Sequence, residues 1–208
     1  FFFFFQAEDG IRVLVRSRGL GDVYKRQFVS GAGLLISKEY YRDVGGLDED
    51  FLIYNEDQNL SWKGLMKGYT HFVSSRSVLY HHFDFHRRPF KIYHSEKNRI
   101  MMLFENYTSK TLAFMVPIIF LNEMAALIYS PFGGYLSHKL KSYWYVLTHW
   151  KEIADKRKRV QAERIVPDRD IIGQFDATFN FSVMNNFAIR YILNPLYAMY
   201  YKFLLKVV

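Results

Sequence analysis

The sequence contains no cysteine, and this absence excludes two kinds of site. Without thiols the chain has neither a disulfide framework nor a thiolate ligand for zinc. It also lacks a His-Glu-x-x-His motif, which excludes the common helical site of zinc hydrolases. A chain without cysteine fits a reducing compartment such as the cytoplasm.

The first residues of the sequence do not read as a secretory signal peptide. Five phenylalanines at positions 1–5 precede any positive charge and lead into the acidic pair Glu8-Asp9, whereas a signal peptide places positive charge before a longer apolar run. Residues 1–27 instead resemble translated sequencing-adapter read-through. We therefore expect residues 1–27 to be an artefact, and Phe28 to mark the point where a longer gene was cut.

The composition indicates a folded protein with an anionic partner. Hydrophobic residues make up 50% of the chain and charged residues 23%, as in globular proteins. Aromatic residues reach 19%, and aromatic side chains favour interfaces, including the boundary between water and lipid. The net charge of +8 predicts binding to a phospholipid headgroup, a nucleotide diphosphate or a nucleic acid.

Hydrophobic periodicity and turn residues divide the remainder at about Thr108. Residues 28–107 read as α/β, and residues 108–208 as a helical tail that is basic and aromatic. No internal repeat is visible. In the first part we predict strands at 29–36, 71–73 and 77–80, and helices at 38–44, 56–67 and about 91–107.

Two adjacent acids, Glu56 and Asp57, begin the helix predicted at 56–67. The positive end of the helix dipole stabilises negative charge there and keeps a carboxylate ionised. An ionised carboxylate is what an inverting glycosyl transfer needs, because a base must take the proton of the acceptor hydroxyl. Acids at a helix start are also common without any catalytic role.

The surrounding residues resemble bacterial family 2 glycosyltransferases of the rhamnosyltransferase-like group, over residues 28–175. The motifs that carry the resemblance are Ser30-Gly31-Ala32-Gly33, Gly45-Gly46-Leu47-Asp48-Glu49-Asp50-Phe51, Asn55-Glu56-Asp57, Leu60-Ser61-Trp62-Lys63 and Tyr80-His81. The resemblance implies the C-terminal part of a GT-A (nucleotide-diphospho-sugar transferase) fold. It also implies transfer of a sugar from a nucleotide-diphosphate donor to a glycan or lipid-linked glycan, as in cell-wall or polysaccharide biosynthesis. The donor-binding half would precede Phe28, so we expect this chain alone to be inactive.

The resemblance also implies roles for single residues. Asp57 would be the catalytic base and Glu56 its acidic neighbour, while Trp62 would line the acceptor pocket. The loop near donor and acceptor would be Gly31, Ala32 and Gly33.

Two residues depart from the family pattern. Asn59 stands where the family often has a second acid, and Lys63 stands where arginine is usual. Neither departure removes the base, but both leave the substrate less defined. The acidic run 48–50 reads as a solvated turn.

A histidine cluster follows the predicted strand at 77–80. It comprises His81, His82 and His86, with His71 and His94 nearby. A single histidine at a strand end is often only a hydrogen-bonded surface residue, but histidine also binds divalent metals. By the resemblance, His81 would be a ligand of a Mn²⁺ or Mg²⁺ ion that neutralises the departing diphosphate. The other ligands would come from an Asp-x-Asp motif in the missing half.

Basic residues follow the histidines, among them Arg87, Arg88 and Arg99. Arginine matches phosphate geometry with paired donors, so this cluster is a candidate pyrophosphate site. A solvated helix face with Glu96 and Glu105 as partners explains the same residues equally well.

The apolar stretch 111–132 has the length of a membrane span but contains Pro117, Asn122 and Glu123. An acid at the centre of a bilayer costs about 2.5–3.5 kcal/mol on insertion scales. Basic residues on both sides also argue against a single crossing. We therefore expect re-entrant or interfacial helices on an anionic membrane surface, at the cytoplasmic face where nucleotide sugars are found.

The alternative is a basic membrane-peripheral or nucleic-acid-binding module without catalysis. The aromatic residues lie in apolar stretches and do not alternate with lysine and arginine, and no nucleic-acid motif occurs. We therefore expect no nucleic-acid partner.

Overall fold

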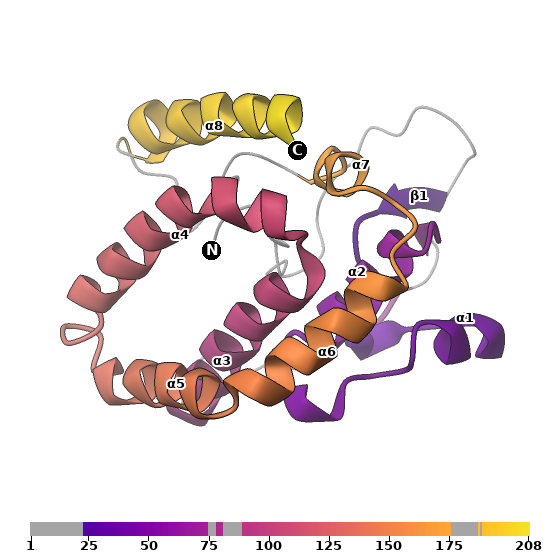
Figure 1. Ribbon diagram of the computed structural model, residues 1–208, viewed down its shortest axis with the longest axis horizontal. Helices are drawn as coiled ribbons and strands as arrows, with labels where there is room; N and C mark the ends of the chain where they lie inside the picture. The colour runs from indigo at the N-terminus through magenta and orange to yellow at the C-terminus, as the bar shows by residue number, and fades with distance from the viewer. Residues whose placement is uncertain (1–22, 75–77, 81–88, 176–186, 188) are drawn as a thin grey trace.

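The structure is a computed structural model, and it describes residues 23–74, 78–80, 89–175, 187 and 189–208 (Figure 1). These residues are mostly helical. The strands are β1 (Val23–Arg26) and β2 (His71–Ser74), and the 3-10 turns are η1 (Gly31–Gly33) and η2 (Glu49–Phe51). The helices are α1 (Lys38–Asp43), α2 (Glu56–Met66), α3 (Pro89–Asn106), α4 (Ser109–Tyr129), α5 (Leu136–Thr148), α6 (Trp150–Ala162), α7 (Asp168–Ile172) and α8 (Asn194–Val207), with a π-helical turn, η4 (Ile189–Leu193), before α8.

The two strands pair antiparallel, with Val23 opposite Ser74 and Arg26 opposite His71. They are the only sheet among the described residues. The described residues are thus mostly helical with one two-stranded sheet, and the sheet expected of a GT-A domain is not among the described elements.

Strand β1 falls inside residues 1–27, the segment interpreted above as an artefact; residues 1–22 lie outside the described part of the chain. Backbone hydrogen bonds between strands place almost no demand on side-chain identity, so an open strand edge pairs with any extended segment that reaches it. The pairing of β1 with β2 therefore carries no information on the origin of residues 23–26.

The predicted helices at 38–44 and 56–67 are confirmed as α1 and α2. Ser37 caps α1, because its hydroxyl accepts from the amide of Tyr40. Tyr40 then lies across α2, where its hydroxyl and ring would clash with a β-carbon placed on Gly64. Its hydroxyl donates to the carbonyl of Leu60. Glycine at position 64 thus allows α1 to pack closely against α2.

The strand predicted at 29–36 is wrong. The segment forms the 3-10 turn η1 instead, in which the Ser30 hydroxyl accepts from the amide of Ala32. This local bond competes with pairing to a neighbouring strand. Of the strand predicted at 77–80, residues 78–80 are described and are not a strand, whereas β2 confirms the strand predicted at 71–73.

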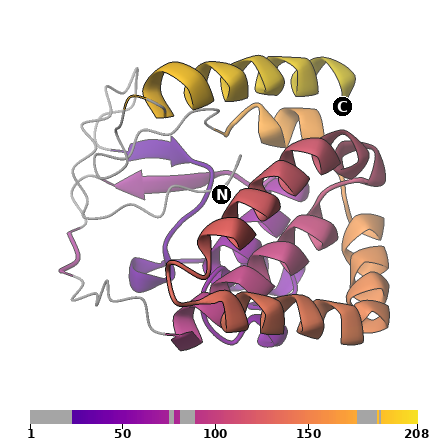
Figure 2. The ribbon, with the colours of Figure 1, turned by 90° about the vertical axis from the view of Figure 1, so that its left-hand side faces the viewer.

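Helix α3 confirms the helix predicted at about 91–107, and it lies at the centre of the helical part, packed against α5 and α6 (Figures 1 and 2). The main core joins residues on both sides of the boundary expected at Thr108, for example Trp62 and Met101 with Met115 and Tyr197. The composition changes at Thr108, where α4 begins, but the hydrophobic core continues across it.

Helix α4 is long and apolar enough to cross a membrane by length and composition, with a mean hydropathy of 1.9. Only 17% of an 18-residue apolar stretch of α4 is buried inside the protein. It is the only such helix among the described residues. Most of its apolar surface therefore faces outward.

Candidate functional site

The structure brings together two motifs that lie far apart in the sequence. The backbone amide of Gly31, in the turn η1, donates a 2.8 Å hydrogen bond to Oδ2 of Asp57 at the start of α2. The other carboxylate oxygen, Oδ1, accepts from the amide of Gln58 at 2.8 Å. The predicted base therefore has both oxygens oriented by backbone donors, beside the predicted donor and acceptor loop.

Further contacts fix this turn against α2. The Ser61 hydroxyl donates to the Asp57 carbonyl at 2.8 Å and accepts from the amide of Val29 at 3.2 Å. At the other end of the turn, a β-carbon placed on Gly33 would lie 3.2 Å from the side chain of Leu79. The segment that leads to Tyr80-His81 thus begins next to the same turn.

Glu56, the acidic neighbour, is half-buried, and its Oε2 is buried with no hydrogen-bond partner within the described part of the chain. Burial raises the pKa of Glu56 above its ordinary value, and the adjacent carboxylate of Asp57 adds to this shift. The pair therefore differs in environment: Asp57 is held by amide donors, whereas Glu56 is pushed toward its protonated form.

The loop that leads into α2 is strained. Leu52, Tyr54 and Asn55 all have positive φ, at 52°, 67° and 66°. Residues with side chains seldom adopt positive φ angles. Bulky residues that do adopt them cluster at functional sites. Three of them within four residues, directly before the Glu56-Asp57 pair, require other parts of the protein to hold the loop.

Helix α3 supplies that support through two consecutive residues. The Asn98 side-chain amide donates to the carbonyls of Phe51, Ile53 and Tyr54 at 2.7, 2.9 and 2.6 Å. Next to it, Lys97 Nζ donates to the carbonyl of Asp50 at 2.6 Å. Sequence reasoning missed Asn98, because α3 buries several polar residues and no local pattern distinguishes this one.

The interpretation of the acidic run 48–50 as a solvated turn is wrong for Asp48, whose side chain is only 3% exposed. The ammonium groups of Lys156 and Lys63 contact this carboxylate, and Asn59 donates to it at 3.3 Å. Burial opposes its charge, but the bond from Lys156 and the two lysine charges outweigh burial and hold the pKa of Asp48 below its ordinary value. Asp48 therefore joins α2 to α6.

Both departures from the family pattern meet at this carboxylate. Asn59 is buried and also accepts a 2.7 Å hydrogen bond from Asn106 of α3, while Lys63 lies 3.4 Å from Asp48. An acid at position 59 would face Asp48 across the same short distance. Asn59 avoids that repulsion, so this departure has a structural reason.

Trp62 does not line an open pocket. Its side chain is fully buried, packed edge-on against Tyr107 at 4.7 Å and Phe175 at 5.8 Å between ring centroids. In an α-helix, residues 57 and 62 lie five positions apart and point to different sides. Trp62 therefore belongs to the hydrophobic core of the described residues, and its contact with the acceptor stays a prediction.

The guanidinium of Arg99 is paired with carboxylates, and its role as a phosphate ligand stays a prediction. Its guanidinium contacts Glu96 at 2.9 Å and also contacts Glu123 of α4. Lys139 of α5 is fully buried and joins the same two carboxylates at 2.7 and 3.0 Å. Glu105, the other partner expected on a solvated helix face, is completely buried. The two cations, Arg99 and Lys139, thus neutralise the carboxylates of Glu96 and Glu123.

His81, Arg87 and Arg88 lie outside the described residues, as do His82 and His86. Within the described residues no three His, Asp or Glu side chains gather in a way that could hold a metal ion. The nearby histidines have other surroundings: His71 is buried at 3.0 Å from the Tyr40 hydroxyl, and His94 is buried against Phe90.

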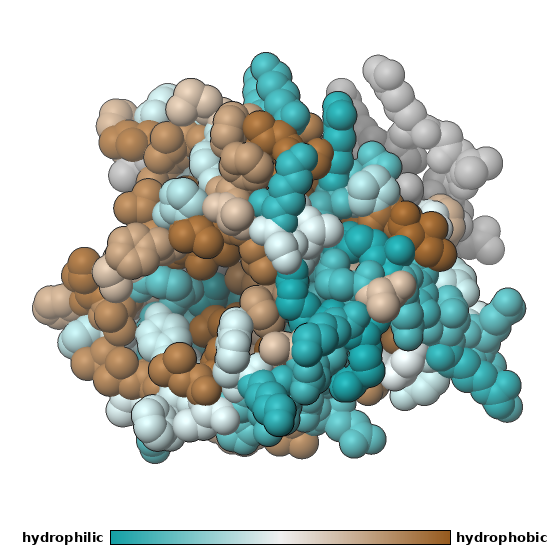
Figure 3. All heavy atoms as spheres, viewed as in Figure 1, coloured by the Kyte–Doolittle hydropathy of each residue, from teal (hydrophilic) through white to brown (hydrophobic). Residues whose placement is uncertain are grey.

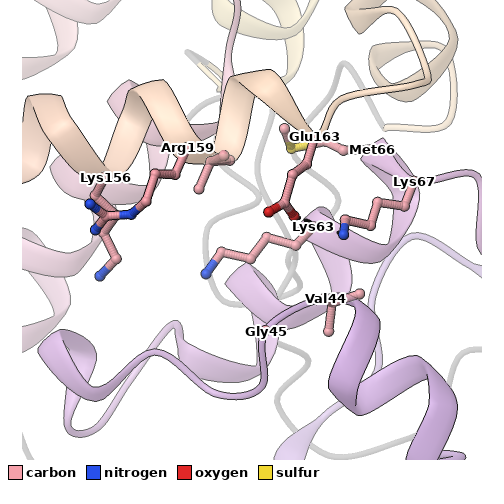
Figure 4. Close-up of a pocket in the computed structure, with 9 residues that line it drawn as sticks. Val44, Gly45, Lys63, Met66, Lys67, Lys156, Arg159 and Glu163 are labelled. Carbon is pink, nitrogen blue, oxygen red and sulfur yellow. Dashed lines mark ion pairs between the residues drawn. The ribbon is translucent and has the colours of Figure 1, made fainter.

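A cavity of about 200 Å³ lies between the second half of α2 and α6 (Figure 4). Lys63, Lys67, Lys156 and Arg159 line it, with Glu163 as the acid. Lys67 contacts Glu163 at 2.8 Å, and the other two lysines contact Asp48. Because Asp57 stands at the opposite end of α2, this cavity is separate from the Gly31–Asp57 site.

No protein family, curated protein or solved structure matches the chain. The resemblance to family 2 glycosyltransferases rests on the motifs themselves.

Proposed function

We propose that this chain is the acceptor-side part of an inverting family 2 glycosyltransferase. The complete enzyme transfers a sugar from a nucleotide-diphosphate donor to a glycan or lipid-linked glycan at the cytoplasmic face of the cell membrane, and this chain alone is inactive. The observation that carries the proposal is the hydrogen bond from Gly31 to Asp57, because it joins the two motifs on which the family resemblance depends.

In the proposed reaction the acceptor hydroxyl oxygen attacks the anomeric carbon of the donor. Its proton passes to Asp57, and the bond to the diphosphate breaks on the opposite face of the sugar, with its electron pair leaving on the diphosphate oxygen. Each oxygen of Asp57 accepts one backbone bond and keeps a second lone pair, so the carboxylate is oriented and still able to take a proton.

A divalent ion, Mn²⁺ or Mg²⁺, is part of this proposal. It would offset the charge that develops on the departing diphosphate. His81 is its proposed ligand from this chain, with the remaining ligands in the donor-binding half that the resemblance places before Phe28.

The test replaces the proposed base in the complete enzyme. Asp57→Asn cannot accept the proton, so we expect turnover to fall about 10²–10⁴-fold, measured as release of the nucleoside diphosphate. The matched control is Asp43→Asn, which neutralises a carboxylate that contacts Lys67 at the C-terminal end of α2 and Tyr69, away from Asp57. Turnover of Asp57→Asn equal to that of Asp43→Asn would remove Asp57 from the mechanism.

A further inference from the structure

Three helices present apolar side chains to solvent on one side of the molecule. We define the α4–α5–α8 face by six side chains that are each at least 60% exposed: Phe120, Leu121 and Ile128 of α4, Trp144 and Leu147 of α5, and Met199 of α8. Figure 3 shows hydrophobic residues gathered over the half of the molecule that carries α8, α4 and α5, whereas hydrophilic residues cover α6. A single-domain protein seldom leaves so many large apolar side chains together in water.

The two polar residues near the middle of α4, Asn122 and Glu123, are paired with other helices. Asn122 accepts a 3.1 Å hydrogen bond from the Tyr197 hydroxyl of α8. Glu123 contacts Arg99 and Lys139, and the Tyr143 hydroxyl donates to it. The two residues that made a membrane crossing costly in the sequence are thus satisfied inside the protein, and the outward side of α4 is left apolar.

Exposed lysines stand beside the apolar side chains. Lys141 precedes Trp144 by one helical turn on α5, and Lys202 follows Met199 by one turn on α8, so each lies next to its apolar neighbour on the helix surface. An exposed apolar face that includes aromatic rings and is flanked by cations matches the interface of an anionic bilayer, where the apolar side chains enter the lipid and the cations meet the headgroups.

We propose that the α4–α5–α8 face is the surface by which this protein binds a membrane that contains anionic lipids, with α4 lying in the plane of the interface and both of its ends on the same side. A second copy of the chain fits the face less well, because a face-to-face pair brings the same lysines together in a chain whose net charge is +8.

This inference extends the membrane part of the proposed function by naming the surface and the orientation. Vesicle binding needs no sugar donor, acceptor or metal. A failure to bind vesicles therefore leaves the transferase chemistry untouched, and an inactive Asp57 variant that still binds leaves this inference untouched.

The first experiment is flotation of the 208-residue chain with vesicles of phosphatidylcholine alone and of phosphatidylcholine mixed equally with phosphatidylglycerol. We expect binding to the mixed vesicles to be stronger. The double variant Phe120→Ser/Leu121→Ser should lower the partition coefficient by at least about tenfold, because two inserted apolar side chains are lost.

The matched control is Phe72→Ser/Val73→Ser, which removes two exposed apolar side chains from β2, outside the face. It should bind like the parent. Equal binding by the Phe120→Ser/Leu121→Ser variant and the parent overturns the proposal. So does sedimentation that shows a dimer of the parent converted to a monomer by the same variant, since the face then belongs to a second copy.

The second experiment tests the orientation of α4, and the absence of native cysteine makes it direct. Lys110→Cys and Ser137→Cys place single thiols at exposed positions near the two ends of α4. On sealed vesicles, a membrane-impermeant maleimide added outside should label both variants. Protection of one thiol until the vesicles are dissolved would show that α4 crosses the bilayer, and the proposed in-plane orientation would be wrong.

Discussion

The part of the chain around Asp57 and the helical part from α3 onward satisfy their charged groups differently. In the helical part, Arg99 and Lys139 meet Glu96 and Glu123 in a closed and buried cluster. Around Asp57 the candidate base faces the short turn η1, and the strained loop before it depends on side chains from α3. The difference indicates that the helices are a scaffold, and that the proposed site is a set of short segments held against it.

The largest expected effect comes from opening the buried cluster. Glu123→Gln leaves Arg99 and Lys139 facing a neutral amide, and removal of one partner from a buried ion pair costs about 3–5 kcal/mol. Glu163→Gln, which removes an acid that is 60% exposed beside Lys67, should cost at most about 1 kcal/mol. Urea unfolding of the two variants measures this difference, and equal losses would mean that the cluster does not stabilise the scaffold.

The pH dependence of the same variant sharpens this test. Burial opposes the charge of Glu123, but Arg99 and the Tyr143 hydroxyl outweigh burial and lower its pKa from 4.5 to about 2. A lowered folded-state pKa stabilises the protein above the unfolded value, and this stabilisation is lost as the pH falls toward 2. The advantage of the parent over Glu123→Gln should therefore shrink below about pH 4.5.

A second prediction concerns Glu105 on α3, the helix that also supports the loop before Asp57. Both of its carboxylate oxygens are buried without a hydrogen-bond partner among the described residues, and burial raises its pKa from 4.5 to about 7. Between these values the folded state holds a proton that the unfolded state has lost. Stability should therefore fall by about 3 kcal/mol as the pH rises through this window.

The variant Glu105→Gln removes the titration. It should abolish that fall and exceed the parent in stability by about 2 kcal/mol at pH 8, after the cost of burying an unpaired amide. Unfolding free energies at pH 4.5 and pH 8 provide the measurement. The same slope in parent and variant would assign the pH dependence to other groups.

Sequence patterns predicted the helices well and the site only in part. Ser37 before α1 and the positive-φ Gly68 after α2 mark helix ends by local chemistry, which a sequence displays directly. The burial of Trp62 and the ion pairs of Arg99 depend on residues from distant segments of the chain. Neither Phe175 beside Trp62 nor Glu123 beside Arg99 is signalled by any local pattern. The same holds for Asn98, whose partners are backbone carbonyls more than 40 residues away.

The smallest expected effect tests whether the loop before Asp57 is strained for the benefit of the site. Leu52 has φ 52° and ψ −58°, which lies outside the regions open to residues with a side chain, and it is 71% exposed, so little burial is lost on its removal. Leu52→Gly should raise the unfolding free energy by about 0.5–1 kcal/mol, because relief of strain exceeds the added freedom of the unfolded chain. The control Leu35→Gly changes a leucine that is 98% exposed and lies outside the positive-φ region, so it should destabilise slightly.

In the complete enzyme, Leu52→Gly should also lower turnover, since a relaxed loop no longer fixes the start of α2 and the carboxylate of Asp57. Equal stability changes in the two glycine variants would show that the loop stores no strain, and a more stable Leu52→Gly enzyme with full turnover would separate that strain from catalysis.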